Sequence, residues 1–459
     1  MSVPLQLRTI DTLLQQGQQQ QALTNARQLA ADITARSDSS VSWLGQLALQ
    51  LSTLQQFSDA ATLYQRAIAL KADDATLHYN YATMLRVCGE LKQAEQQLDI
   101  AIKLNPDDAE AWQLRSGLGK QTAVSNHVNE LKQQLSRSDL SAKARVHLQY
   151  ALAKELEDLA DYQASFAALK HGADLRRRHI NYDIQQDVAV MQSIVANFNR
   201  PFFARPASGC DTDEPIFVVS LPRAGSTLLE RFLGSSEQVH LAGELNNFAR
   251  CLQQQLQQQF PGWRPASKVA MVEQSRQLDF AQLGQRYLDS TRPHTGQSRY
   301  FVDKLPLNFL YVGLIHRALP NARIIHVKRQ PLDHCYAMYK HLFADAYPFS
   351  YQLSELAQYY HAYQQLMQHW QQVLPGVIHD VRYEELVTTP EPCVQALYQH
   401  CRLPWSADYL AFHQQNRQAS ATGSASQIRQ PLYRSSVERW RCYEKELDPL
   451  QHALQGLAL

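Results

Sequence analysis

Arg223, Gly225, Ser226 and Thr227 lie in a stretch whose residue types suit the binding of a phosphate-like anion. The apolar run 216–219 predicts a strand buried on both faces, and the proline and glycine that follow predict a tight turn. Ser226 can then cap an amphipathic helix. A strand, a glycine-containing turn and a helix N-terminus direct backbone N–H groups and a helix dipole at an anion. Arg223 and the two hydroxyl groups add further donors.

The same turn lacks the lysine of a nucleoside-triphosphate loop. Such loops read GxxxxGK[ST], in which the lysine contacts the terminal phosphates and the hydroxyl group binds magnesium. Ser226 stands at the position of that lysine. The sequence therefore disfavours a nucleotide-dependent kinase, and a purely structural turn stays open until the other segments are considered.

A second pair of cations follows a later apolar run. Residues 322–327 predict another buried strand, and Lys328 and Arg329 come directly after it, ahead of a helix that begins at a proline. This arrangement predicts a second anion site. Asp333 lies four residues after Arg329, so an ordinary ion pair between the two is the alternative.

Three more segments end in side chains that could take part in catalysis or ligand binding. Glu244 follows a short apolar segment and a glycine, Asp303 and Lys304 end an apolar run, and Tyr383 follows a predicted strand at 377–381. Each has an ordinary interpretation as well: a solvated glutamate, a surface ion pair and a core tyrosine.

The elements that must position these residues form two regions. From Pro215 onward, apolar strands alternate with amphipathic helices, which predicts a three-layer α/β domain with a mainly parallel sheet. Ligand sites in such sheets lie at the carboxyl ends of the strands, where the candidate residues fall. Segments rich in Pro, Gly and Asp between 199 and 215 place the boundary, giving domains at 1–200 and 201–459.

The first region is helical and repeats with a period of about 34 residues. In two successive units, small alanines recur where paired helices approach closely and larger side chains fill the seam between them. The pattern resembles a tetratricopeptide array, an all-α solenoid. Arrays of this kind bind a protein or peptide partner along a concave face, and a rigid spacer or dimerisation surface is the alternative. The matching positions are Leu47, Ala48, Leu51, Ala60, Tyr64 and Ala67 in one unit, and Tyr81, Ala82, Leu85, Ala94, Leu98 and Ala101 in the next.

Chain length, net charge and cysteine content exclude several classes of protein. A chain of 459 residues predicts two or three domains, and its net charge of +1 gives no reason to expect nucleic acid or an anionic membrane as a partner. Seven scattered cysteines without a C-x-x-C pair argue against a disulfide framework or a metal site and suit the cytoplasm. We also expect no secretory signal and no membrane span.

Taken together, residues from about 215 to 445 resemble the sulfotransferases that use 3′-phosphoadenosine 5′-phosphosulfate (PAPS). The similarity is greatest to the tyrosylprotein-sulfotransferase branch and its bacterial relatives fused to tetratricopeptide repeats. The motifs that carry it are PRAGSTLLE (222–230), AGEL (242–245), DKLPLNF (303–309), KRQPLDHCYAMY (328–339), VRYEEL (381–386) and RQPLYRSSVERW (429–440).

The resemblance implies PAPS as cosubstrate, no metal, and transfer of a sulfuryl group to a hydroxyl acceptor, with a protein or peptide tyrosine as one candidate. It assigns Glu244 as the catalytic base, Lys304 as the lysine that assists the leaving group, and Ser424 as a serine near that group. Cofactor-binding roles fall to Arg223, Ala224, Gly225, Ser226 and Thr227 at the 5′ end, Arg329 at the 3′-phosphate and Tyr383 at the adenine, and we also expect Arg439 to bind the cofactor.

One departure from the family pattern bears on activity. Ala337 stands where the family places a serine that holds the 3′-phosphate, which weakens this site or moves its donor to Lys328 or Arg439. A nucleotide-binding tetratricopeptide scaffold without full catalytic activity is therefore the alternative function. The rival bases are histidines at positions 240, 326 and 334.

Overall fold

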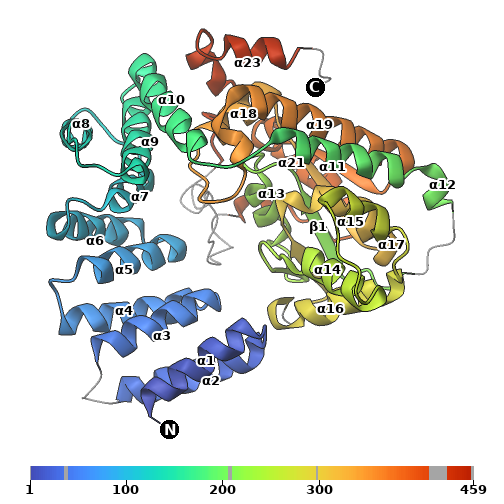
Figure 1. The fold of residues 1–459 in the computed structure, drawn as a ribbon, viewed down its shortest axis with the longest axis horizontal. Helices are drawn as coiled ribbons and strands as arrows, with labels where there is room; N and C mark the ends of the chain where they lie inside the picture. The colour runs from blue at the N-terminus through green and yellow to red at the C-terminus, as the bar shows by residue number, and fades with distance from the viewer. Residues whose placement is uncertain (1, 36–39, 205–208, 296–297, 413–431, 456–459) are drawn as a thin grey trace. The chain divides into compact units, whose positions relative to one another are not determined.

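The computed structural model describes residues 2–35, 40–204, 209–295, 298–412 and 432–455. The chain forms two compact units. The first covers residues 1–176, and the second begins at Arg177. Figure 1 shows the first unit in blue to green and the second in green to red.

The first unit consists of paired helices. The alanines that the repeat pattern places in helix contacts, among them Ala48, Ala60, Ala82 and Ala94, have no exposed surface, so their small size sets the close approach of the helices. Gly89 ends the fifth helix with φ of 91°, a left-handed conformation that glycine adopts without strain. The helices are α1 (Val3–Gln15), α2 (Gln19–Ala35), α3 (Val41–Thr53), α4 (Phe57–Leu70), α5 (Ala75–Cys88), α6 (Leu91–Leu104), α7 (Ala109–Leu118), α8 (Val128–Leu135), α9 (Ala142–Asp158) and α10 (Tyr162–Arg178).

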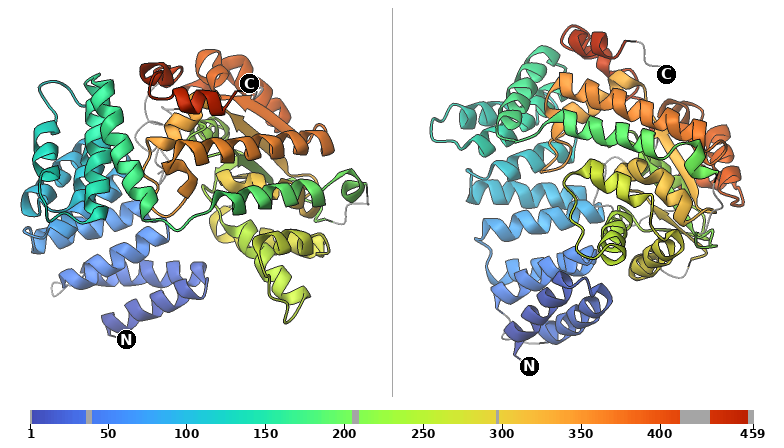
Figure 2. Two further views of the ribbon diagram at one scale, coloured as in Figure 1. Left: turned by 45° about the horizontal axis from the view of Figure 1, so that its top comes forward. Right: turned by 45° about the vertical axis from the view of Figure 1, so that its right-hand side comes forward.

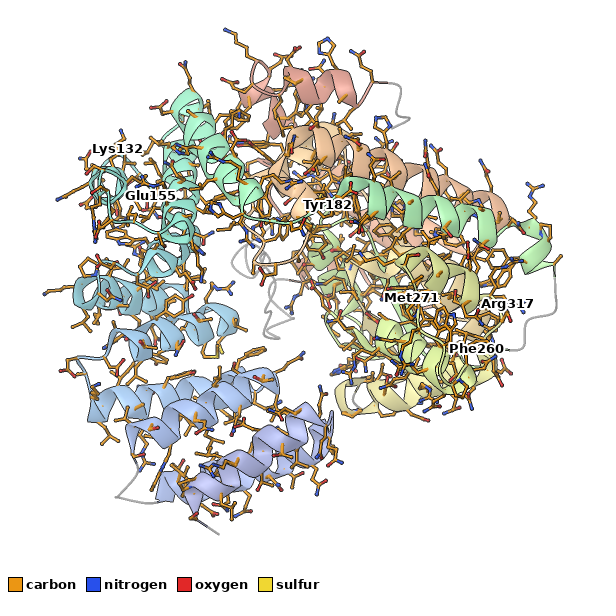
Figure 3. The ribbon with its side chains drawn as sticks, in the orientation of Figure 1. Lys132, Glu155, Tyr182, Phe260, Met271 and Arg317 are labelled. Carbon is orange, nitrogen blue, oxygen red and sulfur yellow. The ribbon has the colours of Figure 1, made fainter. Side chains whose placement is uncertain are left out.

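A buried carboxylate connects the last helices of this unit. Glu155 of α9, labelled in Figure 3, is fully buried and accepts hydrogen bonds from Ser116 Oγ at 2.6 Å and from the backbone N–H of His127 at 2.6 Å. His127 Nδ1 lies 3.2 Å from the same carboxylate, and this contact raises the pKa of His127. The network fastens the segment between α7 and α8 to α9.

Glu155→Ala is expected to destabilise this part of the unit by about 3 kcal/mol, because it leaves buried donors without an acceptor. Native-state hydrogen exchange of peptides from α7 to α9 measures the loss. Glu130→Ala, at an exposed position of α8, is the matched control and should change stability by less than about 0.5 kcal/mol. An equal effect of the two substitutions would contradict the prediction.

The second unit is built on a sheet of five parallel strands in the order β2-β3-β1-β4-β5. All of β1 is buried, as its unbroken apolar sequence predicts for a strand covered on both faces. The parallel α/β architecture predicted from the sequence is confirmed. The strands are β1 (Pro215–Val219), β2 (Val239–Leu241), β3 (Tyr300–Asp303), β4 (Arg323–Lys328) and β5 (Ile378–Arg382).

Helices cover both faces of this sheet, and Figure 2 gives two further views of the layers. Ile216 and Val218 of β1 share one apolar core with Leu229 of α13 and Leu397 of α21. On the other face, Phe217 packs against the rings of α14 and α16, and β4 contacts α19. The helices are α11 (Ile184–Asn197), α12 (Arg200–Phe203), α13 (Ser226–Leu233), α14 (Asn247–Gln259), α15 (Lys268–Ser275), α16 (Phe280–Thr295), α17 (Val312–Ala318), α18 (Pro331–Tyr339), α19 (Leu353–Val373), α20 (Tyr383–Thr388), α21 (Pro390–His400) and α23 (Asp448–Ala453), with 3₁₀ helices η1 (Pro306–Tyr311), η2 (Pro348–Tyr351), η3 (Ala407–Ala411) and η4 (Arg439–Tyr443).

Residues 177–200, which the sequence analysis assigns to the repeat domain, pack within the second unit. Helix α11 lies along α19, and His369 Nε2 lies 2.9 Å from the carbonyl oxygen of Phe198. The Arg177 guanidinium forms an ion pair with Glu355 at 2.7 Å. Further along, Arg317 lies over the ring of Phe202, 5.5 Å from its centroid.

We expect a fragment of residues 177–459 to stay folded and a fragment of residues 201–459 to be much less stable. The shorter fragment loses Ile184, Met191 and Ile194, which are buried in the full chain, and each such side chain contributes about 1.5–3 kcal/mol. Thermal unfolding followed by circular dichroism compares the two fragments. Equal melting temperatures would support the boundary at residue 200 instead.

No described helix is both long and apolar enough to cross a membrane.

Candidate active site

Five candidate side chains come from segments that directly follow the five strands. Arg223 follows β1, Glu244 follows β2, Lys304 follows β3, Arg329 follows β4 and Tyr383 follows β5. Because every strand pair is parallel, these segments all leave the sheet at the same edge. The topology therefore gathers residues that are far apart in the sequence.

The turn after β1 contains two residues with left-handed backbone conformations and leads directly into a helix. Arg223 and Gly225 adopt positive φ angles of 68° and 102°, and α13 begins at Ser226. A Cβ atom on Gly225 would lie 2.4 Å from Cδ2 of Tyr383, so only glycine allows the tyrosine ring to approach. Ala224 is fully buried, and Ser226 and Thr227 are nearly so.

Arg329 lies against this turn. Its Nη1 donates to the carbonyl oxygen of Arg223 at 2.9 Å, and its guanidinium lies 4.8 Å from the ring centroid of Tyr383. Burial and the charge of Arg329 both lower the pKa of Arg223. Two neighbouring guanidinium groups repel each other, and a bound anion would offset that repulsion.

Asp333 does not form the simple ion pair with Arg329 that the sequence analysis considered. Its two oxygens accept hydrogen bonds from the backbone N–H groups of Glu438 at 2.6 Å and Trp440 at 2.9 Å. Arg329 Nη2 donates to the carbonyl oxygen of Ser436 at 2.7 Å. Both side chains thus hold the segment 436–440 against the start of α18.

The remaining residues proposed for the 3′-phosphate occupy different surroundings. Arg439 begins η4 within the segment that Asp333 holds, and it is half-buried. Lys328 Nζ lies 3.5 Å from a carboxylate oxygen of Asp380, on the sheet face that carries His326. Ala337 is buried in α18. Ser424 lies outside the described residues.

Glu244 and Lys304 form a direct pair. Lys304 Nζ donates to Glu244 Oε1 at 2.6 Å; the lysine side chain is 1% exposed and that of Glu244 is 44% exposed. The backbone N–H of Lys304 donates to the carbonyl oxygen of Gly243 at 2.9 Å, which extends the contact between β2 and β3 past the ends of the strands. The arrangement places a solvent-accessible carboxylate beside a buried ammonium group.

Two residues near this pair are not identified by the sequence analysis. Glu230 of α13 is buried, which raises its pKa, and the charge of Lys304 opposes this shift while that of Glu244 adds to it. Tyr347, before η2, is half-buried; burial raises its pKa and the charge of Glu244 adds to that effect. The sequence signal for Glu230 is one acidic residue in an otherwise apolar helix start, and we find none for Tyr347.

Two of the rival bases have other partners. His334 Nε2 lies 3.0 Å from the carbonyl oxygen of Pro222, and burial lowers the pKa of this histidine to about 3, so the neutral ring donates to the turn. His326 Nδ1 lies 2.9 Å from Asp380, and its ring packs against Tyr363 of α19. His240 lies in β2, the edge strand.

No group of three or more His, Cys, Asp or Glu side chains able to hold a metal ion occurs within the described part of the chain.

Two segments of the chain match models of known protein families. Residues 215–407 match the family model described as sulfotransferase family, and residues 53–118 match the model described as tetratricopeptide repeat. A segment similar to sulfotransferases therefore follows a segment similar to tetratricopeptide repeats. The predicted order of a helical solenoid followed by an α/β domain is confirmed.

The sequence identity to individual known proteins is low. An uncharacterized protein of Aquifex aeolicus (strain VF5) is 31% identical over 383 residues, which cover 81% of this chain and 49% of that protein. The chain thus spans about half the length of this curated relative. Among solved structures, the sulfotransferase domain from the curacin biosynthetic pathway is 17% identical with a TM-score of 0.37, covering 52% of this chain and 98% of its own. The sulfotransferase domain of the Synechococcus PCC 7002 olefin synthase is 15% identical with a TM-score of 0.33, covering 52% and 97%.

Proposed function

We propose that the second unit transfers the sulfuryl group of PAPS to a hydroxyl group of an acceptor. The observation that carries this proposal is the Glu244–Lys304 pair, held at 2.6 Å on the same sheet edge as the anion-binding turn. A solvent-accessible carboxylate suits proton removal, and a buried ammonium suits stabilisation of developing negative charge.

The residues on this edge fit an anionic nucleotide. The turn between β1 and α13 offers backbone N–H groups, hydroxyl groups and Arg223 for a 5′-phosphosulfate. Arg329 would bind the 3′-phosphate, with Arg439 as a further donor in the segment that Asp333 holds. Tyr383, with its ring beside Gly225, would contact the adenine.

The chemistry follows an in-line displacement. Glu244 takes the proton of the acceptor hydroxyl as the new S–O bond forms, and the bond between sulfur and the bridging oxygen breaks. The products are the sulfated acceptor and adenosine 3′,5′-bisphosphate. Lys304 and Arg223 stabilise the charge left on the bridging oxygen, and Ser424 would add a donor there. The lysine has three N–H donors, so it can keep Glu244 oriented while it contacts the leaving group.

The assignment to the tyrosylprotein-sulfotransferase branch, with a protein or peptide tyrosine as acceptor, stays a prediction. So does the role of the repeats in recruiting that substrate or another partner protein. All seven cysteines are free thiols, which supports a reducing compartment such as the cytoplasm.

A transfer assay with radiolabelled PAPS tests the proposal. The purified protein is incubated with tyrosine-containing peptides and, separately, with a cell extract, and we expect label in a hydroxyl-bearing acceptor. Binding of adenosine 3′,5′-bisphosphate without any transfer would favour the scaffold alternative that Ala337 suggests. Absence of both binding and transfer in folded protein would overturn the proposal.

A further inference from the structure

Two consecutive carbonyl groups of the turn after β1 are held by side chains of one distant segment. His334 of α18 has its Nε2 atom 3.0 Å from the carbonyl oxygen of Pro222, and Arg329 Nη1 donates to the carbonyl oxygen of Arg223 at 2.9 Å. The partners in these two contacts are 112 and 106 residues apart in the sequence. Two adjacent peptide groups of the turn therefore have carbonyl directions that the segment around the start of α18 determines.

The His334 ring can hold its carbonyl group in only one protonation state. The ring is buried, and within the described part of the chain its Nδ1 atom has no hydrogen-bond partner. A carbonyl oxygen only accepts hydrogen bonds, so the ring proton must lie on Nε2. The ring packs edge to face against Tyr360 of α19, with 5.6 Å between the ring centroids, which fixes its plane. His334 is thus a neutral, immobile donor to the turn.

A side chain that fixes a carbonyl group also fixes the N–H group of the same peptide. Both peptide bonds are trans, so the N–H groups of Arg223 and Ala224 point away from the two donors. Arg223 and Gly225 have positive φ and Ala224 between them does not, and such alternation makes successive N–H groups converge on one side of the backbone. Within the described residues, the N–H groups of 224–227 donate to no acceptor.

Holding the peptide groups in this direction costs stability while no anion is bound. Converging N–H dipoles repel one another, and rotation of a peptide group would exchange its N–H for its carbonyl oxygen. That rotation would break the bond from His334 or Arg329 and leave the buried imidazole without any partner. An apolar side chain would fill the same volume without a polar atom, so packing alone does not explain a histidine at this position.

We propose that His334 is a positioning residue, which together with Arg329 keeps the N–H groups of Arg223 and Ala224 directed at the 5′-phosphosulfate before the nucleotide binds. The identity of the anion rests on the proposed function, whereas the orientation of the peptide groups does not. His334 acts from the far side of the peptide, so it supports affinity for the nucleotide through the turn.

The first test compares two nucleotides that differ only in the 5′-phosphate. His334→Leu fills a similar volume without a donor and should raise the Kd of adenosine 3′,5′-bisphosphate about 3–10-fold, the value of one hydrogen bond. The Kd of adenosine 3′-phosphate should not change. In His334→Gln the side-chain N–H lies as many bonds from Cα as in histidine, and affinity should return to within about 2-fold of the unmodified protein.

Cys335→Ala, at the buried neighbouring position of α18, is the matched control for lost packing and should change neither constant. Equal weakening of both nucleotides in His334→Leu would show a merely structural role and would overturn the proposal. Unchanged binding of the bisphosphate would do the same.

The second test needs no ligand. In crystals of His334→Leu we expect the carbonyl group of Pro222 to rotate or to occupy two orientations. Heteronuclear NMR of the unmodified protein should show the Nε2–H tautomer for His334, with its signal assigned by its absence in His334→Gln. A single, unchanged carbonyl orientation in the variant, or the Nδ1–H tautomer in the unmodified protein, would contradict the role of His334.

Failure of the proposed function can be distinguished from failure of this role. If the unmodified protein binds neither nucleotide, the proposed function fails, and the carbonyl orientation and the tautomer still decide the role of His334. If His334→Leu does not fold, the tautomer and the crystal structure of His334→Gln decide it. We expect the glutamine amide to donate to the carbonyl oxygen of Pro222, and a glutamine that leaves this oxygen without a donor while the turn is unchanged would overturn the proposal.

Discussion

Glu244→Gln is expected to slow sulfuryl transfer about 10²–10⁴-fold, because glutamine keeps the shape of the side chain but cannot accept the proton of the acceptor hydroxyl. Affinity for adenosine 3′,5′-bisphosphate should hold, since the Glu244 side chain faces solvent and Lys304 rather than the anion-binding turn. Single-turnover rates with labelled PAPS measure the first effect, and calorimetry measures the second.

Glu237→Gln is the matched control, an exposed glutamate shortly before β2, and it should leave the rate unchanged. Substitution of His326 or His334 is expected to act through structure rather than through proton removal, because both rings contact the surrounding structure. Near-normal turnover of Glu244→Gln together with loss of activity in His240→Ala would identify the histidine as the base instead.

Arg223→Ala should weaken binding of adenosine 3′,5′-bisphosphate by about 1.5–3 kcal/mol, the value of a hydrogen bond to a charged group. This corresponds to about 10–150-fold in Kd. The substitution also removes a cation next to Arg329, so the loss is smaller than removal of an isolated charge would cause. Isothermal titration calorimetry of the full chain gives the affinity directly.

Arg264→Ala, at an exposed position, serves as the control for the loss of one positive charge. Chelation of magnesium should leave the affinity of the unmodified protein as it is. If the two arginine variants bind equally well, the turn between β1 and α13 does not hold the nucleotide.

The sequence predicts the strand, turn and helix around Arg223 well because their signals are local. A buried strand, a glycine and an amphipathic helix within about ten residues leave few alternative structures, although Ser226 is the first residue of α13 and does not cap it. The positions of Glu244, Lys304, Arg329 and Tyr383 at strand ends also follow from the alternation of strands and helices. The parallel sheet then brings them to one edge.

Contacts between distant segments could not be predicted in this way. Asp333 accepts hydrogen bonds from the backbone N–H groups of Glu438 and Trp440, and peptide groups have no sequence signature. The packing of α11 within the second unit could not be predicted from its sequence pattern for a related reason. An amphipathic helix shows that it has an apolar face, but its sequence does not show which neighbour covers that face.

The position of β1 in the middle of the sheet affects how the protein folds. Ile216 pairs with Val302 on one side and with Arg323 on the other, so β1 acquires both neighbours only after a long stretch of chain has been made. Helical repeats form from contacts close in sequence, whereas such distant strand pairs raise contact order and slow folding. During synthesis the repeats can therefore fold while β1 is still unpaired. The turn that follows β1 therefore gains its final surroundings late in folding, and the nucleotide binding that we propose for it would report complete folding.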